Sequence, residues 1–265
     1  MPFAEINGLT LEYLRIAGAA NQPTLVMLHE GLGSVAMWRD FPQKLAAATA
    51  CSVFVYSRLG YGASEPLPRV GNEGRNIRKP DYMHLEAWET LPALRAASGL
   101  KHVVLFGHSD GASIALLHAA KHAVEGVIVM APHVRVEKIS ITSIEQAKMA
   151  YETGDLRARL AKYHDDVDGA FWGWNDIWLS PDFRDWNIEA ELANIQAPVL
   201  AMQGENDEYG TMYQIEEIQR HKPGTRILRI PSCAHSPHRD QPEQVLALTQ
   251  SFLSTLPQRN TDNAI

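Results

Sequence analysis

A serine in a glycine-flanked turn is the residue of this chain best placed to do chemistry. The turn reads Gly107-His108-Ser109-Asp110-Gly111, follows an apolar run at 102–106 and precedes an alanine-rich helical pattern at 112–120. A strand, Gly-x-Ser-x-Gly and a helix in this order are the layout of a nucleophile elbow, where the serine oxygen projects from the end of a sheet. The bare motif is common by chance, and the flanking elements make it specific. This pattern predicts that Ser109 is a nucleophile for covalent catalysis.

An activated serine needs a base, and that base needs an acid that orients it. Two strand patterns further along the chain end in such residues. Residues 197–203 read as a buried strand that leads into Gly204-Glu205-Asn206-Asp207, and residues 225–230 lead into a loop that ends at His235. The chain therefore carries a serine, an aspartate and a histidine that each follow a strand.

The order Ser109, Asp207, His235 resembles that of the α/β-hydrolase superfamily, and the resemblance extends over nearly the whole chain. It implies that Ser109 is the catalytic nucleophile, Asp207 the acid and His235 the base. It also implies the corresponding fold, a mostly parallel eight-stranded sheet with helices on both faces.

Three nearby residues are alternatives for the acid and the base. His238 lies three residues beyond His235, while Glu205 and Glu208 flank Asp207. The family pattern Gly-x-x-Asp after this strand favours Asp207. The position directly after the last strand favours His235.

A second loop resembles the oxyanion loop of the same family. Residues 24–29 read as a buried strand and run into Glu30-Gly31-Leu32-Gly33-Ser34, with Glu30 where the family usually has a glycine. The resemblance assigns the oxyanion donors to the backbone N–H groups of Gly31 and Asp110, and each such donor contributes about 3–4 kcal/mol. The Asp110 carboxylate would repel an oxyanion unless it is paired or turned away, and the sequence gives it no role.

The composition argues against several other classes of function. The chain has 265 residues, of which 45% are hydrophobic and 21% charged, enough for one α/β domain with a small insertion. A formal charge of −7 leaves no basic footprint for nucleic acid, and no apolar run is long enough for a membrane span. Cys51 and Cys233 are not in a metal-like spacing, and no dinucleotide fingerprint occurs. We therefore expect no metal and no cofactor, only a small-molecule substrate.

The start of the chain bears on its location. It lacks a basic region followed by an apolar stretch, so we expect no signal peptide. With two distant cysteines, the reducing cytoplasm is the predicted compartment. A homodimer is left open.

Alternating patterns predict the elements that position these residues. Residues 4–18 read as a hairpin around Asn7-Gly8. Further strands are expected near 24–29, 52–57, 102–107, 126–131, 197–203 and 225–230, and helices near 36–49, 82–98, 110–122, 211–220 and 240–255. Such alternation predicts a mostly parallel sheet, and right-handed crossovers then bring the carboxyl ends of its strands to one edge.

One segment, from Pro132 to Trp186, contains no buried strand pattern. Short amphipathic helices are expected at 143–151 and 156–164, before a stretch that is dense in aromatic residues. This density argues against disorder. The resemblance makes this insertion after the sixth strand a helical cap over the active site. The expected division is a core of 1–132 and 187–258, a cap of 133–186 and a flexible tail of 259–265.

The candidate pocket residues are His133 and four tryptophans. They are Trp38, Trp172, Trp174 and Trp178. Aromatic residues dominate cores and pockets alike, so the cap tryptophans could equally form its own core. We expect a serine hydrolase that cleaves a small carboxylic ester, aromatic or lactone-like, through an acyl-enzyme. Amide, thioester or carbon–carbon cleavage, transfer to an acceptor other than water, and a non-catalytic receptor stay open.

Overall fold

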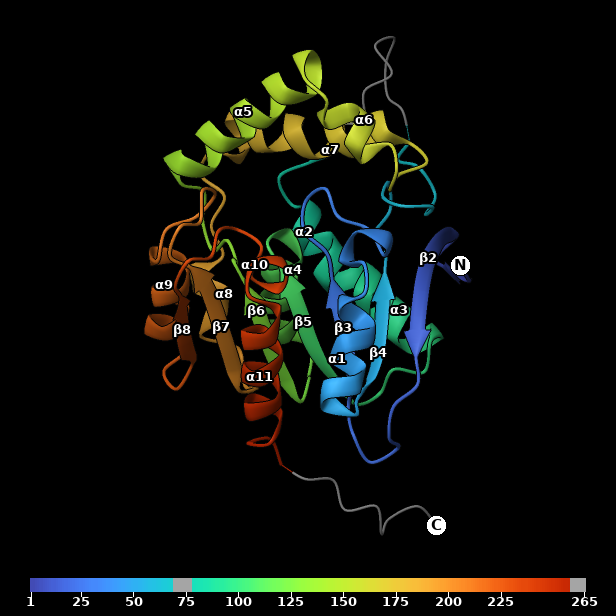
Figure 1. Ribbon diagram of the computed structural model, residues 1–265, viewed down its shortest axis with the longest axis vertical. Coiled ribbons are helices and arrows are strands. Elements are labelled where there is room, and N and C mark those ends of the chain that lie inside the picture. Colours follow the sequence, from blue (N-terminus) through green and yellow to red (C-terminus); the bar gives the residue numbers. More distant parts are fainter. Residues whose placement is uncertain (69–77, 258–265) are drawn as a thin grey trace.

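The computed structural model describes residues 1–68 and 78–257, so the predicted tail of 259–265 lies outside the described residues. The described part contains one eight-stranded sheet, shown in Figure 1, in the order β1-β2-β4-β3-β5-β6-β7-β8. The strands are β1 (Phe3–Ile6), β2 (Leu9–Ile16), β3 (Thr24–Leu28), β4 (Ser52–Tyr56), β5 (Val103–His108), β6 (Gly126–Met130), β7 (Val199–Gly204) and β8 (Arg226–Ile230). The predicted α/β-hydrolase fold is confirmed.

The first two strands form the predicted hairpin. Asn7 and Gly8 connect them with φ angles of 53° and 81°. Both values lie in the left-handed region that a two-residue type I′ turn requires. Strand β1 pairs antiparallel with β2, and β2 antiparallel with β4, whereas all later pairs are parallel.

Successive residues of each central strand point to opposite faces, and each face carries its own apolar core. In β3, Leu25 and Met27 join one core while Val26 and Leu28 join the other. Helices α1 (Phe41–Thr49) and α11 (Pro242–Leu253) cover the first face. The second is covered by α2 (Tyr82–Leu85), a π-helical turn (Glu86–Thr90), α3 (Leu91–Ala97), α4 (Asp110–Lys121), α8 (Glu189–Leu192) and α9 (Tyr213–His221). Burial on both faces explains why these strands read as continuous apolar runs.

One helix expected to be continuous is broken. The segment near 36–49 is a 3-10 turn (Ala36–Trp38) followed by α1, and Arg39 between them has a φ of 55°. The helix expected near 240–255 is α11, and a separate short helix, α10 (Pro237–Asp240), precedes it. Pro242 starts α11 because a proline has no N–H to continue a preceding helix.

Three helices form a separate layer above the carboxyl edge of the sheet (Figure 1). We call α5 (Lys138–Thr153), α6 (Leu156–Leu160) and α7 (Val167–Leu179) the upper helical layer; a 3-10 turn (Pro181–Phe183) follows it. Helix α5 begins earlier than the expected 143. Helix α7 occupies the aromatic stretch, where no helix was predicted. Most of its residues are buried, and the half-buried ones, Asp168, Trp172, Asp176 and Leu179, fall on a single narrow stripe.

Candidate active site

The turn between β5 and α4 holds Ser109 in a strained backbone conformation. Its φ is 53° and its ψ is −120°. A Cβ atom added to Gly107 would lie 2.4 Å from the carbonyl oxygen of Gly111, and one on Gly111 would lie 2.1 Å from the carbonyl oxygen of Leu28. Only glycine fits at both positions, so the motif makes this sharp turn possible.

The structure brings Ser109, His235 and Asp207 together in one hydrogen-bonded row. Ser109 Oγ lies 2.9 Å from His235 Nε2, and His235 Nδ1 lies 2.8 Å from Asp207 Oδ1. The three residues follow β5, β8 and β7, whose carboxyl ends meet at this edge of the sheet. A serine beside a histidine that a carboxylate orients is the geometry of nucleophilic catalysis.

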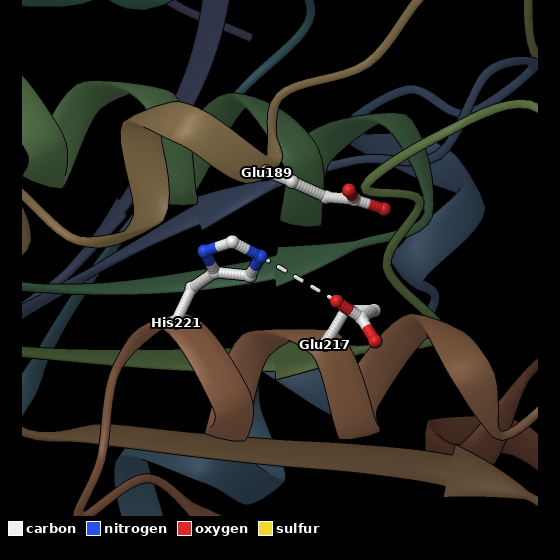
Figure 2. Close-up of side chains that lie close together, drawn as sticks. All are labelled: Glu189, Glu217 and His221. Atoms are coloured by element: carbon white, nitrogen blue, oxygen red, sulfur yellow. Dashed lines mark ion pairs between the residues drawn. The ribbon is translucent and has the colours of Figure 1, made fainter.

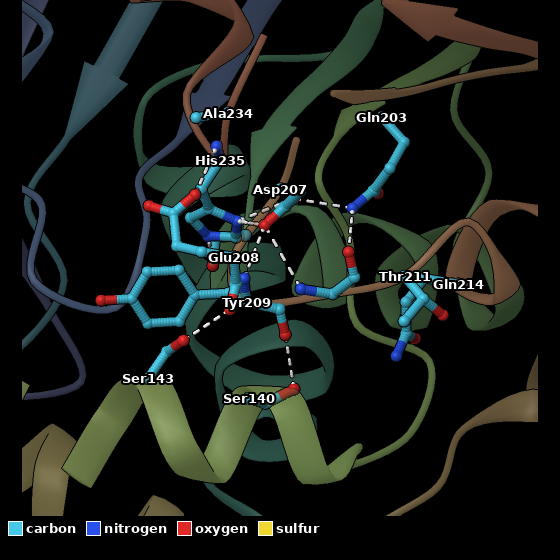
Figure 3. A network of polar contacts seen from close by, with 12 residues as sticks. Ser140, Ser143, Gln203, Asp207, Glu208, Tyr209, Thr211, Gln214, Ala234 and His235 are labelled. Atoms are coloured by element: carbon cyan, nitrogen blue, oxygen red, sulfur yellow. Dashed lines mark hydrogen bonds and ion pairs between the residues drawn. The ribbon is translucent and has the colours of Figure 1, made fainter. Parts of the chain in front are cut away.

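Asp207 is held by donors on both of its carboxylate oxygens (Figure 3). Oδ1 accepts from the backbone N–H groups of Tyr209 at 2.8 Å and Gly210 at 3.2 Å. Oδ2 accepts from Gln203 Nε2 at 2.6 Å. The sequence analysis missed Gln203, since it reads as the end of a buried strand. Its one signal is that a polar side chain stands there.

Electrostatics favour the charged forms of this pair, a carboxylate on Asp207 and an imidazolium on His235. Burial acts to raise the pKa of Asp207, but His235 and the backbone donors outweigh it, and the pKa is lowered. Burial acts to lower the pKa of His235, but the Asp207 carboxylate outweighs it and the pKa is raised. The carboxylate therefore stays ionised and stabilises an imidazolium.

Helix α5 clamps the loop that carries Asp207. Ser140 Oγ donates to the carbonyl oxygen of Tyr209 at 2.6 Å, and Ser143 Oγ donates to that of Glu208 (Figure 3). On the opposite side, His108 Nε2 donates to the carbonyl oxygen of His235 at 2.7 Å. The acid and base loops are therefore fixed from two directions.

The alternatives for base and acid take no part in this row of hydrogen bonds. His238 is buried against Trp38 and Phe41, and neither of its ring nitrogens has a hydrogen-bond partner in the described part of the chain. Burial holds its pKa well below the usual value. Glu205 and Glu208 are exposed. Only the carboxylate of Asp207 accepts from the His235 ring among the described residues.

Gly31 and Asp110, whose backbone N–H groups are the expected oxyanion donors, line the same cavity as Ser109. Neither amide donates to an acceptor within residues 1–68 and 78–257. A Cβ on Gly31 would lie 2.2 Å from Trp174 Nε1, so this position requires glycine. Both donors are thus free for an oxygen atom of a substrate.

The Asp110 carboxyl group is buried and turned into a hydrogen-bonded chain. Tyr82 donates its hydroxyl to Asp110 Oδ2 at 2.5 Å, and Trp178 Nε1 donates to Tyr82 Oη at 3.1 Å. Burial raises the pKa of Asp110, against the opposing effect of Arg58. Pairing and a raised pKa together reduce the repulsion that a carboxylate beside the nucleophile would cause.

Glu30 is paired in a different way. Its carboxylate lies 3.4 Å from His108 Nδ1 and 3.2 Å from Arg239 Nη2. Burial acts to raise its pKa, but these contacts outweigh it and hold the pKa well below the usual value. Glu30 therefore links the loop that carries Gly31 to the elbow and to α10.

A cavity of about 180 Å³ opens onto Ser109. Three of the candidate pocket residues, His133, Trp174 and Trp178, line it. Burial lowers the pKa of His133 to about 3, so its ring is neutral there. The lining residues that the sequence analysis missed include Leu32, Ile144, Tyr209 and Ser236.

Trp38 and Trp172 do not line this cavity, which corrects the sequence-based expectation. Trp38 is only 2% exposed and packs against Phe41 and His238 below the elbow. Trp172 packs against Tyr151 and Phe171 between α5 and α7. Both therefore serve the packing of the protein.

Comparisons with known proteins agree with this fold. A model of the Alpha/beta hydrolase family matches residues 25–248. The chain is 22% identical to the proline iminopeptidase of Lactobacillus crispatus, with 91% of this chain and 94% of the relative covered. It is 26% identical to the N-formylmaleamate deformylase of Pseudomonas putida, with 86% and 87% covered.

Solved structures show the same likeness. The enol-lactonase from Burkholderia xenovorans superposes with a TM-score of 0.72 at 21% identity, and the match covers 96% of this chain and 100% of that one. Among the helices of the described residues, none has the length and apolar character that crossing a membrane requires.

Proposed function

Because this chain belongs to the alpha/beta hydrolase family, we propose that it is a serine hydrolase that cleaves a small carboxylic ester through an acyl-enzyme. One observation carries the proposal: Ser109 Oγ, the His235 ring and the Asp207 carboxylate form a continuous row of hydrogen bonds. A nucleophile, its base and the orienting acid are the minimum set for this chemistry.

In the proposed reaction, His235 Nε2 accepts the proton of Ser109 while Oγ attacks the ester carbonyl carbon. The imidazolium then gives this proton to the leaving alcohol, and the acyl group stays on Ser109. Water, activated by the same imidazole, attacks the acyl-enzyme and releases the acid. Asp207 stays ionised, keeps the ring oriented and stabilises its positive charge.

We assign the oxyanion hole to the backbone N–H groups of Gly31 and Asp110. Both border the cavity beside Ser109, and neither has an acceptor in the described part of the chain. Preorganised donors of this kind act on the charge that develops in the transition state, and each contributes about 3–4 kcal/mol. The pairing of the Asp110 side chain with Tyr82 supports this role for its backbone.

The substrate we propose is compact and carries an aromatic or lactone ring. A cavity of about 180 Å³ leaves little room for a long acyl chain, and Trp174, Trp178 and Tyr209 give it flat apolar walls. The enol-lactonase supports the lactone alternative, while the iminopeptidase and the deformylase keep other carbonyl substrates in view.

We further propose that residues 133–186 are a cap and that 1–132 with 187–258 are the core. The position of the upper helical layer over the carboxyl edge supports this division, as do Trp174 and Trp178 at the cavity (Figure 1). We also propose a cytoplasmic location, which the two free, buried cysteines, Cys51 and Cys233, favour. The homodimer stays a prediction.

A fluorophosphonate reagent tests the nucleophile. We expect one adduct per chain, mapped by peptide mass spectrometry to Ser109 and absent from Ser109→Ala. As a matched control, Ser236→Ala removes another hydroxyl at the cavity and should keep the adduct. No labelling of the folded protein, or an adduct on another serine, would falsify the proposal.

The bond type is tested by esters, thioesters and amides that share one acyl group. We expect kcat/KM to be highest for the ester, and the activity to disappear in Ser109→Ala. A preference for the amide would replace the esterase proposal with a peptidase-like one and keep the same residues.

A further inference from the structure

Three side chains that could bind a metal ion gather outside the cavity at Ser109, where α8 packs against α9. Glu217 and His221 lie one turn apart on α9, and Glu189 faces them from the start of α8 (Figure 2). One ligand atom from each lies within 4.8 Å of the others. The proposed hydrolase reaction uses none of them.

Glu217 is the unusual member of this cluster. Its side chain is only 6% exposed, and its Oε2 atom accepts no hydrogen bond in the described part of the chain. Oε2 points to His221 Nε2, with which it forms an ion pair only while the imidazole is protonated. A buried carboxylate oxygen without a donor is costly, and a cation at this point would remove the cost.

The distances suit a tetrahedral ion. Two ligand atoms that are each about 2.1 Å from a tetrahedral metal are about 3.4 Å apart. The distance from Glu217 Oε2 to His221 Nε2 is 3.4 Å. Glu189 is half-buried, so its side chain can close the remaining gap by rotating.

Each of the two carboxylates accepts a hydrogen bond from a neighbouring side chain through only one of its oxygen atoms. Arg220 Nη1 donates to Glu217 Oε1 at 2.9 Å, which leaves Oε2 to the cluster. The Tyr213 hydroxyl donates to Glu189 Oε1 at 3.1 Å. Such outer contacts orient metal ligands.

We propose that Glu189, Glu217 and His221 bind one divalent transition-metal ion of the Zn²⁺ type, with water completing its coordination. One imidazole nitrogen and two carboxylate oxygens suit zinc, whereas Mg²⁺ and Ca²⁺ take ligands that are all oxygen. The site is structural, because none of its residues lines the cavity at Ser109 and it connects two helices.

The two helices border the segments that lead into and out of the upper helical layer. Arg135 pairs with Asn187 in an isolated bridge, and Glu189 follows Asn187 by two residues. On α9, Gln214 Oε1 accepts from the backbone N–H of Val134 at 2.6 Å. An ion between α8 and α9 therefore stabilises the two segments that connect the upper helical layer to the rest of the protein.

Calorimetric titration of the chelator-treated, full-length protein with ZnCl₂ tests the site. We expect one ion per chain and a higher melting temperature with zinc, because a ligand that binds only the folded state stabilises it. Glu217→Gln and His221→Asn should each weaken binding at least tenfold and abolish the thermal shift. Both replacements are close in size, and circular dichroism verifies that they fold.

Glu216→Gln is the matched control. This variant removes a carboxylate from the same helix. That carboxylate pairs with Arg229 outside the cluster, so zinc binding should stay as in the wild type. Two results would overturn the proposal: a wild type that shows no zinc-dependent heat or thermal shift, or equal binding in wild type, Glu217→Gln and His221→Asn. Equal binding would place the ion elsewhere, for example at the imidazoles around His235.

Discussion

Replacing the acid by its amide, Asp207→Asn, perturbs the candidate triad without changing its shape. Oδ1 of Asp207 accepts from two fixed backbone N–H groups, at Tyr209 and Gly210, so the asparagine oxygen must stay at this position. The new NH₂ group then replaces Oδ2. There it faces His235 Nδ1, which is 3.0 Å from Oδ2 in the wild type.

The amide acts on the ring in two ways. It is uncharged, so it no longer stabilises the imidazolium. His235 Nδ1 lies 2.8 Å from the retained oxygen position and 3.0 Å from that of the new NH₂ group. Where the NH₂ group donates to Nδ1, the proton of the neutral imidazole moves to Nε2, and a ring protonated there cannot accept the serine proton. The same replacement in other serine triads lowers turnover by about 10⁴. We therefore expect kcat/KM to fall by about 10³–10⁴, or about 4–5 kcal/mol in the activation barrier.

The fold should lose little stability. Gln203 Nε2 lies 2.6 Å from Oδ2, so the new NH₂ would meet another donor. Gln203 Oε1 has no hydrogen-bond partner among the described residues, and a flip of the Gln203 amide would let it accept from the asparagine. The flip breaks the 3.1 Å bond from Gln203 Nε2 to the Gly210 carbonyl oxygen. One such bond contributes about 1 kcal/mol to the free energy of unfolding.

Steady-state kinetics on a 4-nitrophenyl ester, together with thermal melting, measure both effects. Glu205→Gln is the matched control, because it removes an exposed carboxylate from the same loop and should change kcat/KM less than threefold. If Asp207→Asn keeps kcat/KM within tenfold of the wild type while its melting temperature is normal, Asp207 does not orient the base.

Two further predictions concern pH and the cavity wall. His235 must be neutral to accept a proton, and Asp207 raises its pKa above the ordinary 6.5. We therefore expect kcat/KM to rise with pH, with a midpoint above 6.5, and then to level off. A flat profile from acid to alkaline pH would speak against His235 as the base. Trp174→Ala should lower kcat/KM for an aromatic ester about tenfold more than for an acetyl ester. Trp172→Ala changes a tryptophan outside the cavity and should leave the ratio of kcat/KM between the two esters unchanged. The same ratio in both variants would mean that Trp174 does not contact the substrate.

The polar residues that converge here could be predicted from sequence because each follows a segment that reads as a strand. Parallel strands deliver their carboxyl ends to one edge, so knowing the strands already brings Ser109, Asp207 and His235 together. Gly107 and Gly111 could also be interpreted from the sequence, as parts of the elbow motif. The structure gives the reason: a Cβ atom at these positions would collide with the carbonyl oxygens of Gly111 and Leu28. The catalytic roles stay predictions.

The cavity wall was harder to predict, because it depends on how each helix is rotated. Trp172 and Trp174 are two residues apart on α7, yet Trp172 packs against Tyr151 while Trp174 reaches the cavity. Trp38 packs against Phe41 and His238 and not at the cavity. Such rotations follow from tertiary packing, which a periodicity in the sequence does not encode.

The two serines of α5 limit which foreign segments could replace residues 133–186 without disturbing the loop that carries Asp207. Ser140 and Ser143 donate to the backbone of Tyr209 and Glu208, so helix α5, which contributes Ile144 to the cavity, also holds the loop that carries Asp207. A graft that brought a foreign insertion between residues 133 and 186 would need hydroxyl donors with the same three-residue spacing. Without them, a new specificity would come with a loosened Asp207. Replacing the whole segment would therefore change substrate preference and turnover together. Single substitutions of residues that line the cavity would change the substrate preference and leave α5 in place.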